Sequence, residues 1–230
     1  MIITKQVILR ESPDMTECVR FKLRGVPAGT KINGSLSNIV SVLPWRIDFG
    51  DGTRQTLPPT ETRHPTHDYV EAGDYDLVLY GRLTGVSAGS TRAAPLLGNA
   101  MGKACPGFKE AVFAADSPTA VIDRATFRAC HELESVVLPR RLVMLGANVF
   151  QDCERLTEID LPETITTIGA GAFQNCTGLT KFTIRALEPP EIDESVFTNV
   201  PRTLPIHVPA AAVDAYREAE VWREFQISGL

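Results

Sequence analysis

Residues 145–169 read LGANVFQDCERLTEIDLPETITTIG, and residues 122–146 read IDRATFRACHELESVVLPRRLVMLG, which is the same pattern one period earlier. The phenylalanines of three successive copies are spaced by 23 and 23, and the other special positions keep that interval: Phe127, Phe150 and Phe173; Cys130, Cys153 and Cys176; Leu133, Leu156 and Leu179; Ile122, Leu145 and Ile168; Pro139 and Pro162; Gly146 and Gly169. Such a period is typical of a solenoid, in which each turn buries its apolar side chains by stacking on its neighbours. A solenoid predicts a binding scaffold rather than an enzyme.

Each turn is expected to contribute one short strand to a parallel sheet. Along that strand Leu133, Val136 and Leu138 point inward, as do their equivalents in other turns, and the residues between them point outward. The outward positions form the candidate binding face: Ser135, Val137, Glu158, Asp160, Lys181, Thr183 and His207. Five strands about 4.8 Å apart predict a face roughly 20 Å across, which is small for a stable protein interface. A solvated face with a cross-strand Glu158–Lys181 ion pair is the simpler interpretation.

The first turn of the solenoid is expected to be irregular, because terminal turns must cap the stack. Subtracting 23 from Val136 gives Phe113 as an inward position of this turn. Val112 and Ala114 then continue the two outward columns.

The last turn is also irregular, since Phe197 follows Phe173 by 24. Good helix formers follow Pro209 and predict a helix over residues 210–220. Apolar side chains beyond Pro209 are expected to cover the open end of the stack: Tyr216, Trp222, Phe225 and Ile227. An aromatic surface that binds sugars is the alternative use of these rings.

The five cysteines do not form a disulfide framework. Three of them, Cys130, Cys153 and Cys176, share one repeat position and should point inward in parallel. A row of parallel thiols cannot pair throughout, and free cysteine behaves as a small buried hydrophobe. The sequence therefore predicts reduced, buried cysteines with no metal and no redox role.

Residues before about 85 follow a different pattern. The runs VRFKL at 19–23 and WRIDF at 45–49 alternate apolar and polar side chains, as half-buried strands do. The second run enters the turn GDGT at residues 50–53, and a further strand, YDLVLY, covers residues 75–80. Short strands joined by turn residues, without a helical period, predict a small all-β sandwich.

The motif DFGDG at residues 48–52, followed by HDY at 67–69 and GDYDLVL at 73–79, resembles the polycystic-kidney-disease (PKD) type of immunoglobulin-like domain. In that family a tryptophan directly precedes the first motif, whereas this chain has Ile47. Trp45 lies two residues earlier and therefore on the same face of the strand, where it can take over the role in the core.

Two arrangements in this segment might be mistaken for metal sites. Asp48 and Asp51 invite a calcium site, but carboxylates at turns accept local backbone hydrogen bonds, and the spacing lacks further oxygen ligands. His64 and His67 invite a zinc site, but no second ligand pair lies nearby. The sequence predicts no metal and no cofactor.

The repeats resemble the bacterial leucine-rich-repeat proteins called BspA-like. The resemblance rests on VFQDCERLTEIDLP at residues 149–162 and on IHVP at 206–209 followed by Tyr216 and Trp222, and it covers about residues 110–230. It implies an exported surface protein of a host-associated bacterium or protozoan, with a role in adhesion or in recognition of host or matrix proteins. A PKD-like domain before such repeats is a familiar arrangement among these proteins.

The predicted organisation is therefore two modules and a cap. A PKD-like β-sandwich covers residues 1–85, and residues 86–107, rich in Gly, Ala and Ser, form a linker and the irregular first solenoid turn. The leucine-rich-repeat solenoid, with parallel strands and short irregular or helical convex segments, covers 108–209, and a helical cap covers 210–230.

Composition argues against several classes of function. A net charge of −5 without a clustered basic face argues against nucleic-acid binding. No stretch approaches the roughly 18 apolar residues of a membrane span. The N-terminus lacks the features of a secretory signal, so either the numbering begins after a removed leader or the protein is not exported by that route. No catalytic motif is present, and the chain is not expected to be an enzyme.

The predicted function is non-catalytic recognition or adhesion at a cell surface, with a protein, or alternatively a glycan, on another cell or matrix as the partner. Two other functions stay open. The first alternative is an accessory carbohydrate-binding module, and the second is a structural component of a phage or virion. A cytoplasmic or virion location is the alternative to the cell surface.

Overall fold

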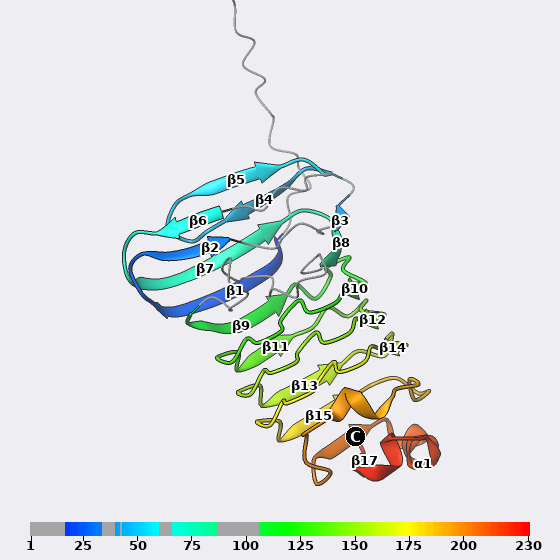
Figure 1. Cartoon of the computed structure of the whole chain (residues 1–230). Coiled ribbons are helices and arrows are strands. Elements are labelled where there is room, and N and C mark those ends of the chain that lie inside the picture. The colour runs from blue at the N-terminus through cyan, green and yellow to red at the C-terminus, as the bar shows by residue number, and fades with distance from the viewer. Residues whose placement is uncertain (1–16, 34–39, 42, 60–65, 87–105) are drawn as a thin grey trace, which may run out of the picture.

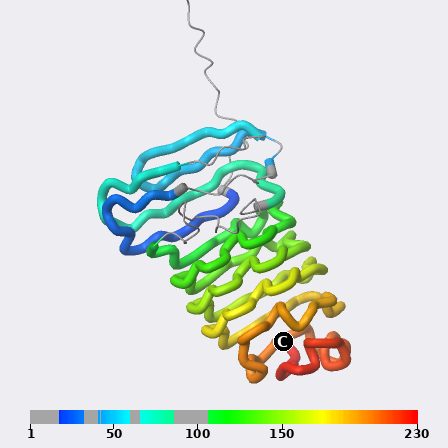
Figure 2. Tube along the Cα trace, viewed as in Figure 1, coloured from blue at the N-terminus to red at the C-terminus, as the bar shows by residue number. Residues whose placement is uncertain are grey.

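The computed structural model describes residues 17–33, 40–41, 43–59, 66–86 and 106–230. The described residues are mostly strands and turns with one short α-helix, as the sequence predicts. Figures 1 and 2 show regular stacked turns below a broader group of strands. The N-terminal segment, His64, Cys105 and most of the predicted linker lie outside the described residues.

The strands before the repeats are mostly antiparallel. They are β1 (Glu17–Val26), β2 (Thr30–Asn33), β3 (Val40–Ser41), β4 (Trp45–Asp48), β5 (Arg54–Leu57), β6 (Thr66–Tyr69), β7 (Gly73–Tyr80) and β8 (Leu83–Val86). On β4, Trp45 and Ile47 are both buried, at 1% and 0% exposed, so the two residues share the core position as expected.

Each turn of the solenoid carries strands on two sides. The long strands are β9 (Phe108–Phe113), β11 (Ser135–Val137), β13 (Glu158–Leu161), β15 (Lys181–Ile184), β16 (Pro205–Val208) and β17 (Gln226–Gly229). The short strands are β10 (Val121–Ile122), β12 (Met144–Leu145) and β14 (Thr167–Ile168). A 3-10 helix, Glu194–Phe197, lies in the last turn, and α1 (Val213–Glu218) follows β16.

Two sheets run without interruption from the N-terminal strands into the solenoid (Figure 1). The first has the order β11-β9-β1-β7-β4-β5, in which β9 pairs with β1 antiparallel and with β11 parallel. The second has the order β14-β12-β10-β8-β3, in which β8 pairs with β10 parallel. Strand pairing therefore joins the two parts of the chain directly.

A ladder of stacked phenylalanine rings forms the centre of the solenoid. The rings of Phe127 and Phe150 lie 5.2 Å apart, those of Phe150 and Phe173 5.5 Å, and those of Phe173 and Phe197 5.8 Å, all within 14° of parallel. At the N-terminal end, Phe127 meets Phe21 of β1 edge-on. The 23-residue period and its extension to 24 at Phe197 are thus confirmed by packing.

The cysteines of the repeat also form the predicted buried ladder. Cys130, Cys153 and Cys176 are free thiols with at most 1% exposure. The thiol of Cys153 donates to the Phe127 carbonyl at 3.1 Å, and that of Cys176 donates to the Phe150 carbonyl at 3.0 Å. The thiols of Cys153 and Cys176 therefore each tie one turn to the turn before it.

The expected register of the first turn is wrong by two residues. Val136 pairs with Ala111 and Val137 with Val112, so the interval is 25 rather than 23. Phe113 still points inward, but Val112 continues the column of Val137, and Ala114 lies beyond the paired strand. The loop between β9 and β11 contains two additional residues, and no local pattern in the sequence reveals them.

The cap differs from the predicted single helix over 210–220. A 3-10 turn at Ala210–Ala212 leads into α1, whose last residue is Glu218, and a final strand, β17, pairs parallel with β16. Trp222 and Phe225 pack on Phe197 at 5.7 and 4.9 Å between ring centroids. The predicted covering of the stack by aromatic side chains is confirmed, and the sheet gains one strand.

Candidate binding face

The outward residues lie in two rows that cross eight strands, in the order β7, β1, β9, β11, β13, β15, β16 and β17. Register places one row along Asp76, Lys22, Glu110, Ser135, Glu158, Lys181, Pro205 and Gln226. The second row follows Val78, Arg20, Val112, Val137, Asp160, Thr183, His207 and Ser228. Every second residue of a strand faces the same side, which is why strands far apart in the sequence contribute to one face.

This face is larger than the sequence indicated. The six-stranded sheet ends at β11, and the four-stranded sheet β13-β15-β16-β17 continues it, since the Thr157 N–H donates to the Glu134 carbonyl at 3.3 Å. Six and four strands make ten, and their nine spacings of about 4.8 Å span roughly 43 Å. The predicted width of roughly 20 Å was too small because it left out the N-terminal strands and β17. A surface of this extent is adequate for a standard protein interface.

Most of the predicted binding residues lie exposed on this face. Ser135, Val137, Glu158, Asp160 and Lys181 are exposed, and His207 is half-buried with its Nδ1 2.9 Å from the Ser228 hydroxyl. The expected ion pair between Glu158 and Lys181 is present, at 3.6 Å between Oε2 and Nζ.

Thr183 does not offer the outward surface expected of it, because its exposure is only 3%. It lies directly opposite Asp160 on one side and His207 on the other. Arg185, which follows the last residue of β15, forms a two-fold contact with Asp160, from Nε at 2.8 Å and from Nη2 at 2.7 Å. Thr183 thus lies between two partners of this bridge, Asp160 opposite it in the sheet and Arg185 two residues farther along the chain.

A groove of about 540 Å³ lies where the strands β11 and β13 end. Its walls combine apolar and charged side chains: Val137, Leu138 and Pro162 with Arg140, Asp160 and Arg185. Val137 belongs to both the second outward row and the wall of the groove. It is 52% exposed, so a large apolar side chain faces solvent there. The charges around it suit the polar rim of a protein interface.

Ion pairs hold the N-terminal part of the face in place. Lys22 lies 2.7 Å from Glu110, and Asp76 binds Arg20 and Arg24, both at 2.9 Å. Burial is the largest single influence on Asp76 and favours its neutral form. The hydrogen bonds and charges of Arg24 and Arg20 together outweigh it, and the pKa of Asp76 lies below its ordinary value.

An arginine–tyrosine pair on the same face was missed by the sequence. The Arg46 guanidinium lies 4.5 Å from the centroid of the Tyr80 ring, and register pairs the two residues across β4 and β7. Arginine and tyrosine are enriched at the energetically dominant positions of interfaces. The pair was overlooked because the binding face was assigned to the solenoid alone.

The two aspartates once considered as calcium ligands form the turn after β4. Asp51 accepts hydrogen bonds from the Thr53 N–H at 3.0 Å and its hydroxyl at 2.7 Å, and its Oδ2 lies 2.8 Å from His67 Nε2. Asp48 binds the Arg54 guanidinium at 2.6 Å. Among the described residues, no three His, Cys, Asp or Glu side chains form a group that could hold a metal ion.

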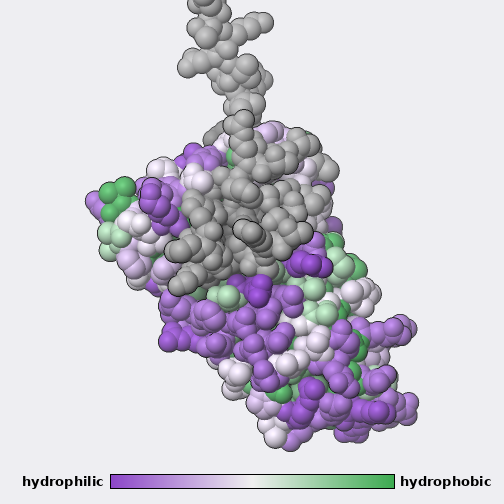
Figure 3. All heavy atoms as spheres, viewed as in Figure 1, coloured by the Kyte–Doolittle hydropathy of each residue, from purple (hydrophilic) through white to green (hydrophobic). Residues whose placement is uncertain are grey.

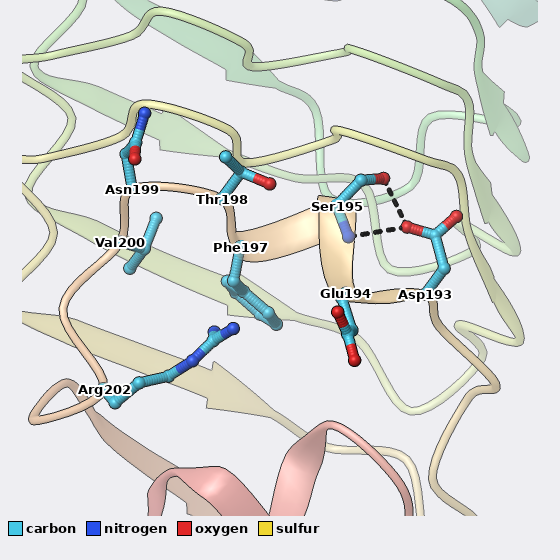
Figure 4. A pocket seen from close by; sticks show the side chains of 8 residues that line it. All are labelled: Asp193, Glu194, Ser195, Phe197, Thr198, Asn199, Val200 and Arg202. Carbon is cyan, nitrogen blue, oxygen red and sulfur yellow. Dashed lines mark hydrogen bonds between the residues drawn. The ribbon is translucent and has the colours of Figure 1, made fainter.

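A shallow hollow lies beside the 3-10 helix of the last turn (Figure 4). The Asp193 carboxylate caps the helix: it accepts hydrogen bonds from the Ser195 N–H at 2.8 Å and from the Ser195 hydroxyl. Arg202 lies 3.0 Å from Glu224 and stacks on Phe225 at 4.7 Å. The Asp193–Ser195 contacts are local to the 3-10 helix, and Arg202 fastens the last turn to Glu224 and Phe225 of the cap.

Surface character agrees with a recognition scaffold. In the view of Figure 3 the solenoid is mostly hydrophilic with scattered apolar side chains. Both tryptophans are buried, Trp45 at 1% and Trp222 at 0% exposure, so neither presents its ring to a ligand. Across the described residues no helix is long and apolar enough to cross a membrane.

Comparison with known proteins agrees with the repeat architecture. A search of curated proteins found no significant match to this chain. Residues 105–215 match the family model of the BspA type leucine rich repeat region in six copies. Six is more than the three copies that keep the strict 23-residue interval, and the matched range includes the irregular first and last turns. Residues 105–215 therefore contain leucine-rich repeats similar to those of the BspA type.

Proposed function

We propose that this protein is a non-catalytic recognition and adhesion protein of a cell surface, which binds a protein on a host cell, matrix or neighbouring cell. The observation that supports this proposal best is the single outward face of ten strands, six in one sheet and four in its continuation. A face roughly 43 Å long supplies the area that a standard interface needs.

The proposal assigns the centre of the interface to Val137 and its neighbours. An exposed apolar side chain, flanked by Val112 in the same row and ringed by charged residues, has the composition of an interface core inside a polar rim. The Arg46–Tyr80 pair supplies a second anchor on β4 and β7, which lie four and three strands from β11, the strand of Val137, or about 19 and 14 Å away across the sheet.

The N-terminal strands are proposed to be a PKD-like domain. Its motif residues act together here, since the His67 ring stacks on Phe49 at 4.2 Å and binds Asp51, while the Tyr69 hydroxyl donates to the Phe49 carbonyl at 2.8 Å. In this proposal the domain presents four of the ten strands of the recognition face and orients the repeats.

The test uses an array of purified matrix and cell-surface proteins, with a glycan array beside it. Val137→Glu and Lys181→Glu should abolish or weaken every genuine protein interaction, because both residues lie at the proposed interface. Arg217→Glu, on α1, is the matched control and should bind like the wild type. Binding that survives both face variants contradicts the assignment of the face.

Location is tested separately, by surface labelling of the producing cells with mass spectrometry of the recovered chain. Labelled, cell-surface protein supports adhesion. A chain confined to the cytoplasm or to virions contradicts it and favours an intracellular partner or a structural role in a virion. Binding to the glycan array alone favours the carbohydrate-binding alternative.

A further inference from the structure

The second sheet stops at β14 because of the residues in the next turn. In earlier turns a backbone N–H reaches back at the same place: Val143 donates to Ala120 at 2.8 Å, and Thr166 donates to Val143 at 2.9 Å. In the next turn the residue equivalent to Thr166, 24 positions farther along the chain, is Pro190, which follows Pro189. Proline has no N–H, so the ladder cannot continue there.

The outer edge of β14 is therefore unpaired. Among the described residues no backbone N–H donates to the Thr166 carbonyl. Thr167 and Gly169 donate towards β12, to Val143 at 3.3 Å and Leu145 at 2.8 Å, so by alternation the Ile168 N–H points to the opposite side. It meets no backbone acceptor within the described part of the chain. One acceptor and one donor thus face the following turn.

A groove of about 1020 Å³ lies between this edge and residues 186–191. Its walls include Thr166 and Thr167 on the strand side and Leu187, Glu188 and Glu191 on the other, with Glu163 at the end. Leu187 is 63% exposed, which is unusual for a leucine in an otherwise polar segment.

The charge of the groove is negative. Arg185 also lines it, but Nε and Nη2 of its guanidinium are bound to the Asp160 carboxylate. Glu163, Glu188 and Glu191 are exposed and form no ion pair with any described residue. Cationic side chains would complement these carboxylates.

The wall formed by residues 186–191 is rigidly held. The Tyr216 hydroxyl donates to the Ala186 carbonyl at 3.1 Å, and Trp222 Nε1 donates to the Pro190 carbonyl at 2.8 Å. Both donors belong to buried rings of the cap. Two consecutive prolines further restrict the backbone, so a ligand entering the groove would not have to order this wall.

We propose that this groove binds an extended segment of a partner protein that carries lysine or arginine next to an apolar residue. The segment lies along the edge of β14, where Thr166 and Thr167 line the groove, and donates a backbone N–H to the Thr166 carbonyl. Its apolar side chain packs on Leu187, and its cationic side chains meet Glu188, Glu191 and Glu163. This site borders the outward face but is separate from it.

The probe is a fluorescein-labelled hexapeptide of alternating valine and lysine, titrated with the full chain at low salt and followed by anisotropy. The expected result is saturable binding that weakens as salt is raised and is absent for a valine–glutamate peptide. Glu188→Gln with Glu191→Gln should weaken binding by about fivefold or more, and Leu187→Ser should do the same. Glu218→Gln and Val70→Ser, exposed residues elsewhere on the chain, are matched controls and should leave it unchanged.

Two further measurements separate strand addition from a general attraction between charges. A peptide N-methylated at alternate residues keeps its charge but loses the donors that the edge needs, and it should not bind. Equal binding of the methylated peptide, or equal weakening by the control variants, overturns the proposal. Val137→Glu should leave peptide binding intact, so that failure of the outward face and failure of the groove are told apart.

Discussion

Two positions of the repeat have a left-handed backbone in successive turns, and the side chains at these positions reflect it. One column comprises Ala125, Asn148 and Gly171, with φ of 56°, 58° and 64°. The other comprises Ala129, Asp152, Asn175 and Asn199, with φ of 57°, 63°, 61° and 61°. Glycine, asparagine and aspartate tolerate this region, whereas other residues are strained there by roughly 1–2 kcal/mol. Alanine in the turn of Phe127 is thus the exception in both columns.

The second column also forms a ladder of side-chain hydrogen bonds. The Asn199 amide donates to Asn175 at 2.7 Å, and the Asn175 amide donates to Asp152 at 2.6 Å. Ala129→Asn should extend this ladder and relieve the strained alanine, stabilising the protein by about 1 kcal/mol and raising the Tm by roughly 2–4 °C. Thermal unfolding followed by circular dichroism checks the prediction. Ala170→Asn, at an exposed site outside the left-handed columns, is the control, and an equal effect of both variants would contradict the mechanism.

The row of buried thiols predicts that these cysteines resist alkylation in the native protein and that the stability of the fold decreases at high pH. Burial raises the pKa of Cys153 well above its ordinary value and raises the pKa of Cys176 to about 12. These thiols bind their protons more tightly in the folded than in the unfolded protein. Their contribution to the free energy of unfolding is therefore fully present below about pH 8.5, the pKa of an unfolded thiol, and it is lost as the pH rises towards the folded-state values. Tm should therefore fall above about pH 9, and less steeply in a Cys153→Ala, Cys176→Ala variant. Alkylation at pH 8 followed by peptide mapping should modify both thiols only in urea, and modification of the native protein would contradict their burial.

At the scale of elements, the cap is fastened to the last turn by polar contacts as well as by packing. Trp222 is buried, contacts Phe197 and Tyr216 edge-on, and donates to the Pro190 carbonyl at 2.8 Å. The cap thus covers the end of the phenylalanine ladder and also holds the proline segment that lines the groove.

Two substitutions separate these roles of Trp222. Trp222→Phe retains most of the packing but leaves a buried carbonyl without its donor, which should cost about 1–3 kcal/mol of unfolding free energy. Trp222→Ala also opens a cavity and should cost about 3–5 kcal/mol. Urea unfolding measures both. Equal values for the two variants would show that the hydrogen bond, and not the ring, accounts for the effect of Trp222.

At the scale of the whole molecule, the N-terminal strands and the repeats share one hydrophobic core and two sheets. The junction also contains a buried polar cluster. The Cys18 thiol lies 3.0 Å from the Ser117 hydroxyl, and the Thr119 hydroxyl donates to the Leu83 carbonyl at 2.8 Å. These contacts join β1, β8 and the start of the repeats, so neither part can unfold without exposing the other's apolar surface.

The chain should therefore unfold in one cooperative transition. Trp222→Phe leaves Trp45 as a reporter of the N-terminal strands, and Trp45→Phe leaves Trp222 as a reporter of the cap. In each variant the fluorescence midpoint should coincide with the midpoint from far-ultraviolet circular dichroism. Two separate midpoints within one variant would show that the parts unfold independently, as modules joined by a linker do.

Much of the fold was predictable because the same pattern of buried residues recurs in each copy of the repeat. The columns of Phe150, Cys153 and Leu156 were assigned correctly, since each turn stacks on an equivalent turn and no distant contact intervenes. The aromatic covering of the last turn followed from the same reasoning, because an open stack must be closed. The candidate face was predicted in part, with Ser135, Val137, Glu158, Asp160 and Lys181 placed outward correctly.

The remaining features depend on contacts between segments far apart in the sequence. The two-residue shift at β9 is absorbed in a loop, and β17 reaches the sheet only after the cap has turned the chain back. The pairing of β1 with β9 brings Tyr80 and the repeats onto one face. The sequence did not reveal this pairing, because backbone hydrogen bonds between strands leave no signature in the period of the side chains. Periodicity fixes which side chains of a turn are buried, and the pairing of distant strands fixes how far the binding face extends.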